Sequence, residues 1–235
     1  MRIGIALSIA LAISISARTQ VLKPIAKFKL NIEEVSDLKL HPNGTDFIAT
    51  TDFGLIHHLD STFEIQFTSP FQGDDFEGLC ILNDTIYVSE DRDRQLILFL
   101  PDSLKFIRAY TVPFVMRNGD HIEGMIALPH TNRILLFSEE KPIEIFSYNP
   151  RSQTHEVITK DDLPEIASLD FWNDRLFALS DESPELIELN PTNLEIIRRW
   201  RIRVNNAEGL CFRNGYMYIV SDELRKAFQF EIPSL

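Results

Sequence analysis

A phrase of four residues recurs five times along the chain, at residues 35–38, 76–79, 122–125, 166–169 and 207–210. The third residues of successive copies are 41, 46, 44 and 41 positions apart. A repeat of about forty residues that is built from short apolar strands is typical of β-propeller blades. This repeat constrains the fold more than any other feature, and it predicts one blade for each copy.

In every repeat, the four-residue phrase is followed by a second recurring phrase. In this second phrase, a run of apolar residues ends with an acidic residue. In the second repeat, residues 78–82, 85–89, 95–100 and 105–112 have the composition of four strands separated by turns. The last repeat has three such strands. We expect residues 25–32, which alternate apolar and polar side chains, to supply its outer strand and close the ring.

The prediction is therefore an all-β fold, a single five-bladed β-propeller of four-stranded antiparallel blades over residues 20–235. Few or no helices are expected. A six-bladed ring is the alternative, if residues 113–120 hide a degenerate blade.

The N-terminus has the pattern of a secretory signal peptide. Arg2 precedes an apolar stretch at residues 3–15, and the small residues Ser16 and Ala17 suit cleavage. The stretch is short for a membrane span, which needs about 20 apolar residues. We expect residues 1–19 to be a signal peptide, or a short anchor if uncleaved, and the protein to be exported to the periplasm or cell envelope.

The two cysteines, Cys80 and Cys211, occupy the same position in the second and fifth repeats. Those repeats are not neighbours in a five-membered ring, so a disulfide between them would be strained. We expect two buried free thiols that pack as small hydrophobic residues.

A formal net charge of -12 argues against binding to the nucleic-acid backbone and favours cations or basic ligands. One basic run, residues 198–203, alternates arginines with apolar residues. Nucleic-acid binding is one interpretation of this run. We favour an outer strand whose arginines discourage edge pairing.

Acidic residues are concentrated where the first strand of a blade begins and its second strand ends, which is one mouth of the central channel. Glu77, Glu123 and Glu208 begin the first strands of three repeats, and Ser36 and Ala167 take that position in the other two. The acids that end the second strands face the same mouth and are candidates for a ligand-binding face: Asp52, Glu90, Glu139, Asp181 and Asp222.

Carboxylates crowded around one axis must take up protons or bind a cation. Calcium suits them because it takes six to eight oxygen ligands at flexible geometry. Glu77, Glu123 and Glu208 are the candidate metal ligands. His121 is a candidate for a base beside a metal-bound water. The alternative is that these acids lie on a solvated rim or cap turns, and that His121 is a surface residue.

This chain combines two motifs. Glu-Gly-Leu occurs at the start of the first strand of a repeat, and Ser-Asp-Glu occurs at the end of the second strand. Residues 177–189, and residues 207–210 followed by 218–223, carry this combination most clearly. Over residues 30–235 the chain resembles the SdiA-regulated (YjiK-like) β-propeller family. The resemblance implies an exported or membrane-anchored envelope propeller whose biochemical role is undefined. The first and fourth repeats depart from Glu-Gly, which argues against a symmetric ring of five ligands.

The expected function is binding of calcium and of an unknown small molecule or protein at the acidic mouth. One alternative is a calcium-dependent ester or lactone hydrolase, and another is a metal-free interaction scaffold. We expect no nucleic-acid partner, and contact with a membrane only through an uncleaved leader.

Overall fold

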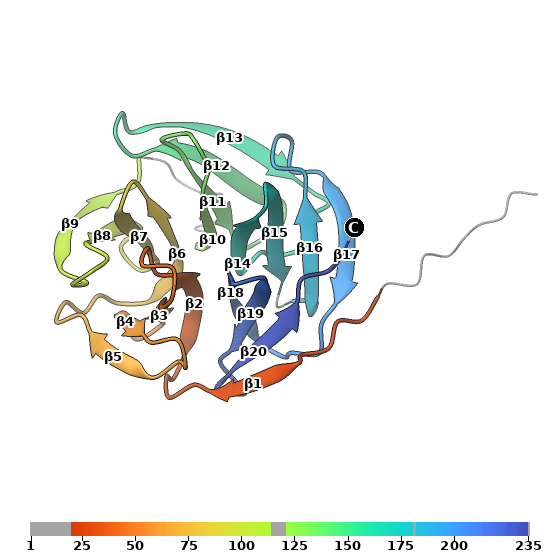
Figure 1. Cartoon of the computed structure of the whole chain (residues 1–235). Coiled ribbons are helices and arrows are strands. Elements are labelled where there is room, and N and C mark those ends of the chain that lie inside the picture. Colours follow the sequence, from red (N-terminus) through yellow and green to blue (C-terminus); the bar gives the residue numbers. More distant parts are fainter. Residues whose placement is uncertain (1–19, 114–120, 181, 235) are drawn as a thin grey trace, which may run out of the picture.

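The computed structural model describes residues 20–113, 121–180 and 182–234. Within these ranges the chain forms twenty strands and no helix, and the strands make five four-stranded antiparallel sheets arranged around a central axis (Figure 1). This confirms the predicted all-β, five-bladed propeller. Residues 114–120, most of the segment considered as a sixth blade, lie outside the described residues. None of the described segments is a helix with the length and apolar character of a membrane span.

Each blade runs from the channel outwards in sequence order. Blade one contains β2 (Val35–Leu40), β3 (Phe47–Thr51), β4 (Leu55–Leu59) and β5 (Ile65–Thr68). Blade two contains β6 (Phe76–Leu82), β7 (Thr85–Glu90), β8 (Gln95–Phe99) and β9 (Phe106–Thr111). Blade three contains β10 (Ile122–Ala127), β11 (Ile134–Ser138), β12 (Ile143–Asn149) and β13 (Thr154–Lys160). Blade four contains β14 (Ser168–Trp172), β15 (Arg175–Ser180), β16 (Glu185–Leu189) and β17 (Ile196–Arg201). Blade five contains β18 (Ala207–Arg213), β19 (Tyr216–Ser221), β20 (Lys226–Glu231) and, from the other end of the chain, β1 (Ala26–Lys29).

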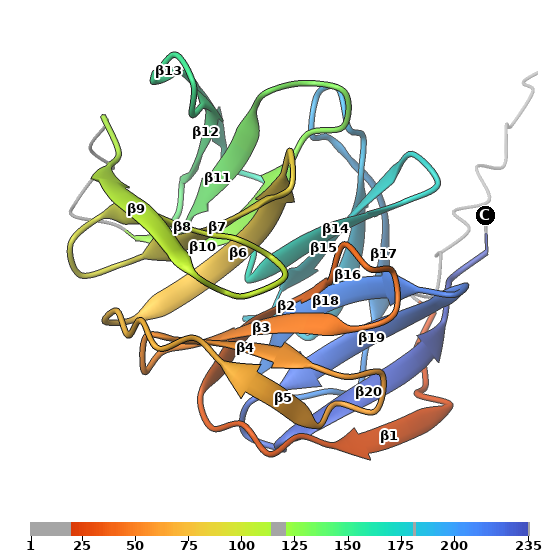
Figure 2. The same ribbon diagram turned by 60° about the vertical axis from the view of Figure 1, so that its left-hand side comes forward.

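The N-terminal strand closes the ring as predicted, because β1 pairs antiparallel with β20. The segment ahead of β1 also crosses blade four, where Val21 forms a parallel bridge with Arg201. The backbone N–H of Leu22 donates to the Arg201 carbonyl at 2.8 Å, and its side chain is buried between blades four and five. The N-terminal segment therefore joins two blades before the first complete blade begins (Figure 2).

The apolar core lies between neighbouring blades. Phe47 and Phe63 of blade one, for example, pack against Tyr218 of blade five. The middle strands are buried on both faces, whereas the outermost strands are largely exposed. Cys80 and Cys211 are buried free thiols, as predicted, and burial raises the pKa of both. The blades thus pack face to face, as stacked sheets do, and leave the inner strands to line the channel.

Candidate cation-binding cavity at the channel mouth

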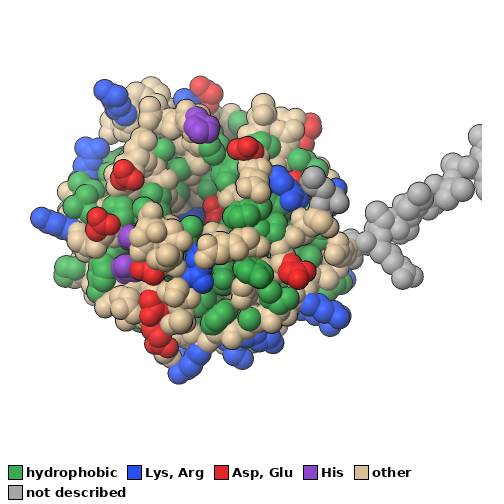
Figure 3. All heavy atoms as spheres, viewed as in Figure 1, with side chains coloured by type: hydrophobic (Ala, Val, Ile, Leu, Met, Phe, Trp, Pro, Cys, Tyr) green, Lys and Arg blue, Asp and Glu red, His purple; other side chains and the backbone are tan. Residues whose placement is uncertain are grey.

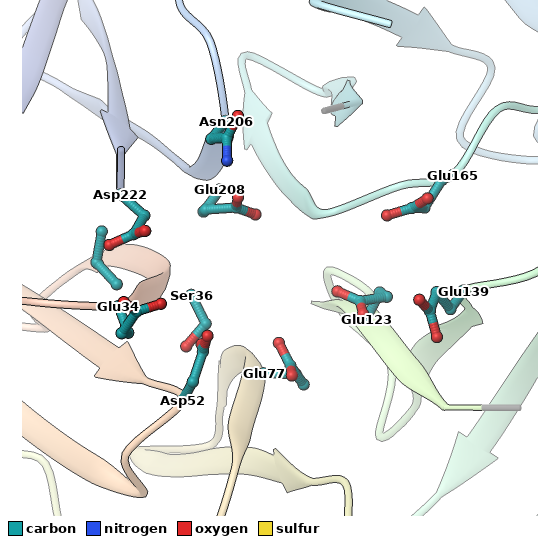
Figure 4. Close-up of a pocket in the computed structure, with 11 residues that line it drawn as sticks. Glu34, Ser36, Asp52, Glu77, Glu123, Glu139, Glu165, Asn206, Glu208 and Asp222 are labelled. Carbon is teal, nitrogen blue, oxygen red and sulfur yellow. The ribbon is translucent and has the colours of Figure 1, made fainter. Parts of the chain in front are cut away.

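A cavity of about 300 Å³ opens at one mouth of the channel. Eight of its lining residues are acidic, and among the described residues no lysine or arginine lines it. Figure 4 shows carboxylates from all five blades turned toward a common space. The lining residues are Glu34, Val35, Ser36, Asp52, Glu77, Glu123, Glu139, Glu165, Asn206, Glu208 and Asp222.

The three predicted metal ligands all line this cavity. Glu77, Glu123 and Glu208 lie near the starts of β6, β10 and β18. In each of these strands the pairing register shifts across the segment that contains the glutamate, which is the pattern of a β-bulge. A bulge re-aims side chains at the end of a strand. Here it accompanies glutamates that point into the channel rather than into the packing between blades (Figure 4).

Three of the predicted ligand-face acids, Asp52, Glu139 and Asp222, also line the cavity. Asp181 lies outside the described residues. Glu90 does not line the cavity. Its buried side chain instead accepts a hydrogen bond from the backbone N–H of Asp74 at 2.9 Å and so holds the loop that leads into β6.

The different role of Glu90 follows from the register of blade two. Glu90 is itself paired across the sheet, opposite Phe76, whereas in blade three Glu139 follows the paired residue Ser138. Blades two and three pair in the same register, so the first acid of the sequence motif lies one position earlier in blade two than in blade three. The residue equivalent to Asp52 and Glu139 is Asp91.

Backbone hydrogen bonds support this equivalence. The N–H of Asp91 donates to the Asp75 carbonyl at 3.0 Å, just as the N–H of Asp52 donates to the Glu34 carbonyl at 3.0 Å. The side chain of Asp91 also contacts Nδ1 of His121. His121, the catalytic candidate, does not line the cavity; this carboxylate holds its ring, and its side chain is 44% exposed.

Sequence reasoning named His121 but missed that it belongs to a ring of polar residues around this mouth. Each member is the residue just before one copy of the repeated four-residue phrase. The members are Glu34, Asp75, His121, Glu165 and Asn206. Their shared register was the signal that could have identified them together. Glu34, Asp75 and Asn206 have φ angles of 49°, 66° and 42°. Such backbone is sparsely populated for residues other than glycine and is concentrated at functional sites.

Two carboxylates of the cavity, Glu77 and Glu123, are buried among other negative charges. Burial, followed by the charges of Asp52 and Asp75, raises the pKa of Glu77 to about 9. Burial and then the charge of Glu77 raise the pKa of Glu123 well above its ordinary value. No described residue donates a hydrogen bond to either side chain. Glu77 therefore holds a proton at neutral pH unless a cation replaces it, and the pKa of Glu123 is shifted in the same direction.

Asp52, at the more exposed rim, responds in the same direction. Partial burial of its carboxylate and the charges of Asp75 and Glu34 raise its pKa to about 6. Asp52, Asp75 and Glu77 each offer one ligand oxygen, and these oxygens lie within 4.8 Å of one another. Oxygens on one calcium ion at 2.3–2.6 Å lie at most about 5 Å apart, so this group matches the requirements of a hard cation. The geometry groups Glu77 with Asp52 and Asp75 more closely than with the glutamates of other blades.

The channel is closed below the cavity by a polar strut made of Asp37, Lys39 and Ser168. The Ser168 hydroxyl donates to Asp37 Oδ1 across the channel at 2.6 Å, and Lys39 Nζ donates to both Asp37 oxygens at 2.6 and 2.7 Å. Glycine lets the strands approach here, since a Cβ at Gly78 would lie 2.3 Å from the Glu123 carbonyl oxygen. The acidic cavity is therefore a pocket that opens at one mouth.

Comparisons with known proteins agree with this fold. The crystal structure of Myxococcus xanthus glutaminyl cyclase matches with a TM-score of 0.75 at 12% identity, covering 90% of this chain and 96% of that one. A structure of U3-55K matches with a TM-score of 0.60 at 9% identity, covering 89% and 98%. Identities this low show a shared fold alone.

No curated protein matches the sequence. The family model described as SdiA-regulated matches residues 17–231, which span nearly the whole described propeller. The chain therefore belongs to the SdiA-regulated family.

Proposed function

We propose that this protein is an exported envelope propeller that binds calcium at its acidic mouth and, beside the ion, a small molecule or a segment of a protein partner. The observation that carries the proposal is the oxygen group of Asp52, Asp75 and Glu77, within 4.8 Å of one another. Two further carboxylates, Glu123 and Glu208, line the same cavity. A divalent cation would relieve their mutual repulsion.

The donor set favours calcium over zinc. All the acidic cavity residues offer oxygen, whereas zinc sites in proteins are usually built with histidine and cysteine. Calcium accepts six to eight oxygens, so three protein carboxylates leave positions for oxygens of a ligand. Because the strut closes the channel below, a ligand would insert an end group from one side rather than thread through the ring.

Thermal unfolding tests the calcium proposal. Protein freed of metal by a chelator should unfold at a higher temperature once calcium is added. A ligand at about 100 times its dissociation constant stabilises the folded state by about 2.7 kcal/mol, which is about 5–10 °C for a domain of this size. The variant Glu77→Gln should lose most of this shift. Glu195→Gln, which alters an exposed glutamate in the turn before β17, should keep it.

Two results would contradict the proposal. One is an unfolding temperature that does not respond to calcium. The other is an equal calcium response in wild type and Glu77→Gln, which would place the ion elsewhere. The metal-free interaction scaffold would then become the better account.

Export is a separate part of the proposal and rests on residues 1–19. Cell fractionation of the tagged full chain should find it in the envelope fraction, and removal of residues 1–19 should retain it in the cytosol. A full chain that stays in the cytosol would refute export without affecting the calcium experiment.

A metal-dependent hydrolase is the second candidate, and the contact between Asp91 and His121 favours it. A carboxylate on Nδ1 fixes the imidazole so that Nε2 can accept a proton, which is the arrangement of a general base. The calcium-loaded protein should then hydrolyse members of an ester and lactone panel. His121→Asn should abolish turnover, and His155→Asn, at an exposed histidine of β13, should not. Absence of turnover over the whole panel would eliminate this candidate.

A further inference from the structure

The positive charges of this acidic protein are unevenly distributed. Residues 20–29 contain three lysines, residues 196–203 contain four arginines, and neither segment contains an acid. The chain as a whole has a net charge of -12. Two basic segments far apart in the sequence are therefore exceptions to the overall composition.

The fold brings these two segments together. Val21 forms a bridge with Arg201, and the Arg201 N–H donates to the Gln20 carbonyl at 2.9 Å. The first segment then continues as β1 along the outside of blade five. Lys and Arg side chains gather along the lower margin of the molecule, where β1 runs (Figure 3).

Five side chains of this region define what we call the basic edge. All are exposed, and none makes an ion pair within the described part of the chain: Lys23, Lys29, Arg201, Arg203 and Lys226. Two other cations of blade four do form ion pairs, Arg175 with Glu188 and Arg199 with Glu185. The cations of the basic edge form no such pair.

One pair within the basic edge is unfavourable as it stands. Lys29 of β1 lies directly opposite Lys226 of β20. Like charges at directly opposed positions of an antiparallel pair destabilise the sheet. An anionic surface outside the sheet would convert this repulsion into a favourable interaction. The pair is an observation independent of the charge count, and it too indicates an anionic partner.

The extent of the basic edge favours a flat partner. Lys29 lies eight positions after Val21, which forms the bridge to Arg201, and this path spans up to about 26 Å in extended chain. Exposed apolar side chains lie among the cations: Val21 is 38% exposed, Ile25 53% and Ile197 54%. A row of cations interspersed with exposed apolar groups matches the headgroup region of a bilayer.

The sequence ahead of the basic edge favours the same partner. The apolar stretch at residues 3–15 is followed by only four residues before Gln20, which span at most about 14 Å. A retained leader would thus hold the basic edge close to the bilayer. Cleavage near Ala17 would instead add an α-ammonium group to the same edge.

We propose that the basic edge docks the propeller on an anionic membrane surface. The edge is formed by outer strands of blades four and five, at the circumference of the ring (Figure 1). This proposal does not depend on calcium, because none of the five cations lines the acidic cavity.

Vesicle co-sedimentation tests the proposal on protein that lacks residues 1–17, since the described strands and the ring closure all lie after Gln20. The protein should bind vesicles of phosphatidylcholine with phosphatidylglycerol, and not phosphatidylcholine alone. High salt should release it. Each cation near an anionic surface changes binding about fivefold, so Arg201→Glu with Arg203→Glu should weaken binding by more than about tenfold.

The matched control reverses two charges on blades two and three, Lys105→Glu with Arg151→Glu, at residues that are also exposed. It should bind like the unmodified protein. The proposal is overturned if the anionic vesicles are not bound, or if both double variants lose binding equally while thermal unfolding shows them folded. Binding of a DNA duplex without binding of vesicles would also overturn it and would assign the edge to nucleic acid.

Discussion

Without calcium, the wild-type protein should become less stable as pH rises. The variant Glu77→Gln should lose less stability over the same pH range. Burial raises the pKa of Glu77 to about 9 in the folded state, whereas an unfolded glutamate titrates near 4.3. Between these two values the folded protein holds a proton that the unfolded chain has released. The free energy of unfolding therefore falls with rising pH, by about 1.4 kcal/mol per pH unit for one such group.

From pH 5 to pH 7 this amounts to about 2.7 kcal/mol, or about 5–10 °C in the unfolding temperature. Gln is a neutral mimic of protonated Glu. The variant should match wild type near pH 5 and exceed it in stability by up to that amount at pH 7. Burial likewise raises the pKa of Glu123, so some pH dependence should remain in the variant.

The assay is thermal unfolding in a chelator at several pH values, with Glu195→Gln as the exposed control. Added calcium should invert the order at pH 7, because the ion requires the carboxylate that the variant lacks. The reasoning is refuted if wild type and Glu77→Gln show the same dependence on pH without metal.

Three further predictions concern the channel and the thiols. Asp37→Asn leaves the buried Lys39 ammonium without its counter-charge, so it should lower stability by about 3–5 kcal/mol in urea titrations; an unchanged midpoint would contradict the strut. Gly124→Ala would place a Cβ 2.5 Å from the Ile166 carbonyl oxygen, and we expect a loss of about 1–3 kcal/mol in the same assay. Cys80 and Cys211 are 1% and 0% exposed, so neither should react with a thiol reagent until the protein is denatured, and rapid labelling of the native protein would show that the channel wall opens.

Blade number and ring closure could be predicted because they depend on local features that recur. Each blade repeats the same short apolar strands, and the β1 sequence alternates as an outer strand does. The positions of Glu77, Glu123 and Glu208 followed from the same repeat, since equivalent residues of equivalent blades must face one axis. The sequence was sufficient where the repeat itself determined the geometry.

Other features depended on pairing that the repeat does not specify. Glu90 and Asp91 are adjacent acids, and only the pairing of Glu90 with Phe76 decides which of them faces the mouth. The hydrogen bond between Asp37 and Ser168 joins residues 131 positions apart, in blades that are not neighbours. Such contacts arise from closure of the whole ring, so neither residue shows a local pattern that predicts them.

Calorimetric titration of the metal-free protein with calcium, in buffers of different ionisation enthalpy, tests the central claim most directly. The claim is that the acidic cavity holds protons which a cation displaces, and metal binding to protonated ligands releases protons. We predict saturable binding at pH 7, with proton release that is reduced in Glu77→Gln. Absence of binding heat in every buffer, or binding without proton release, would contradict the account.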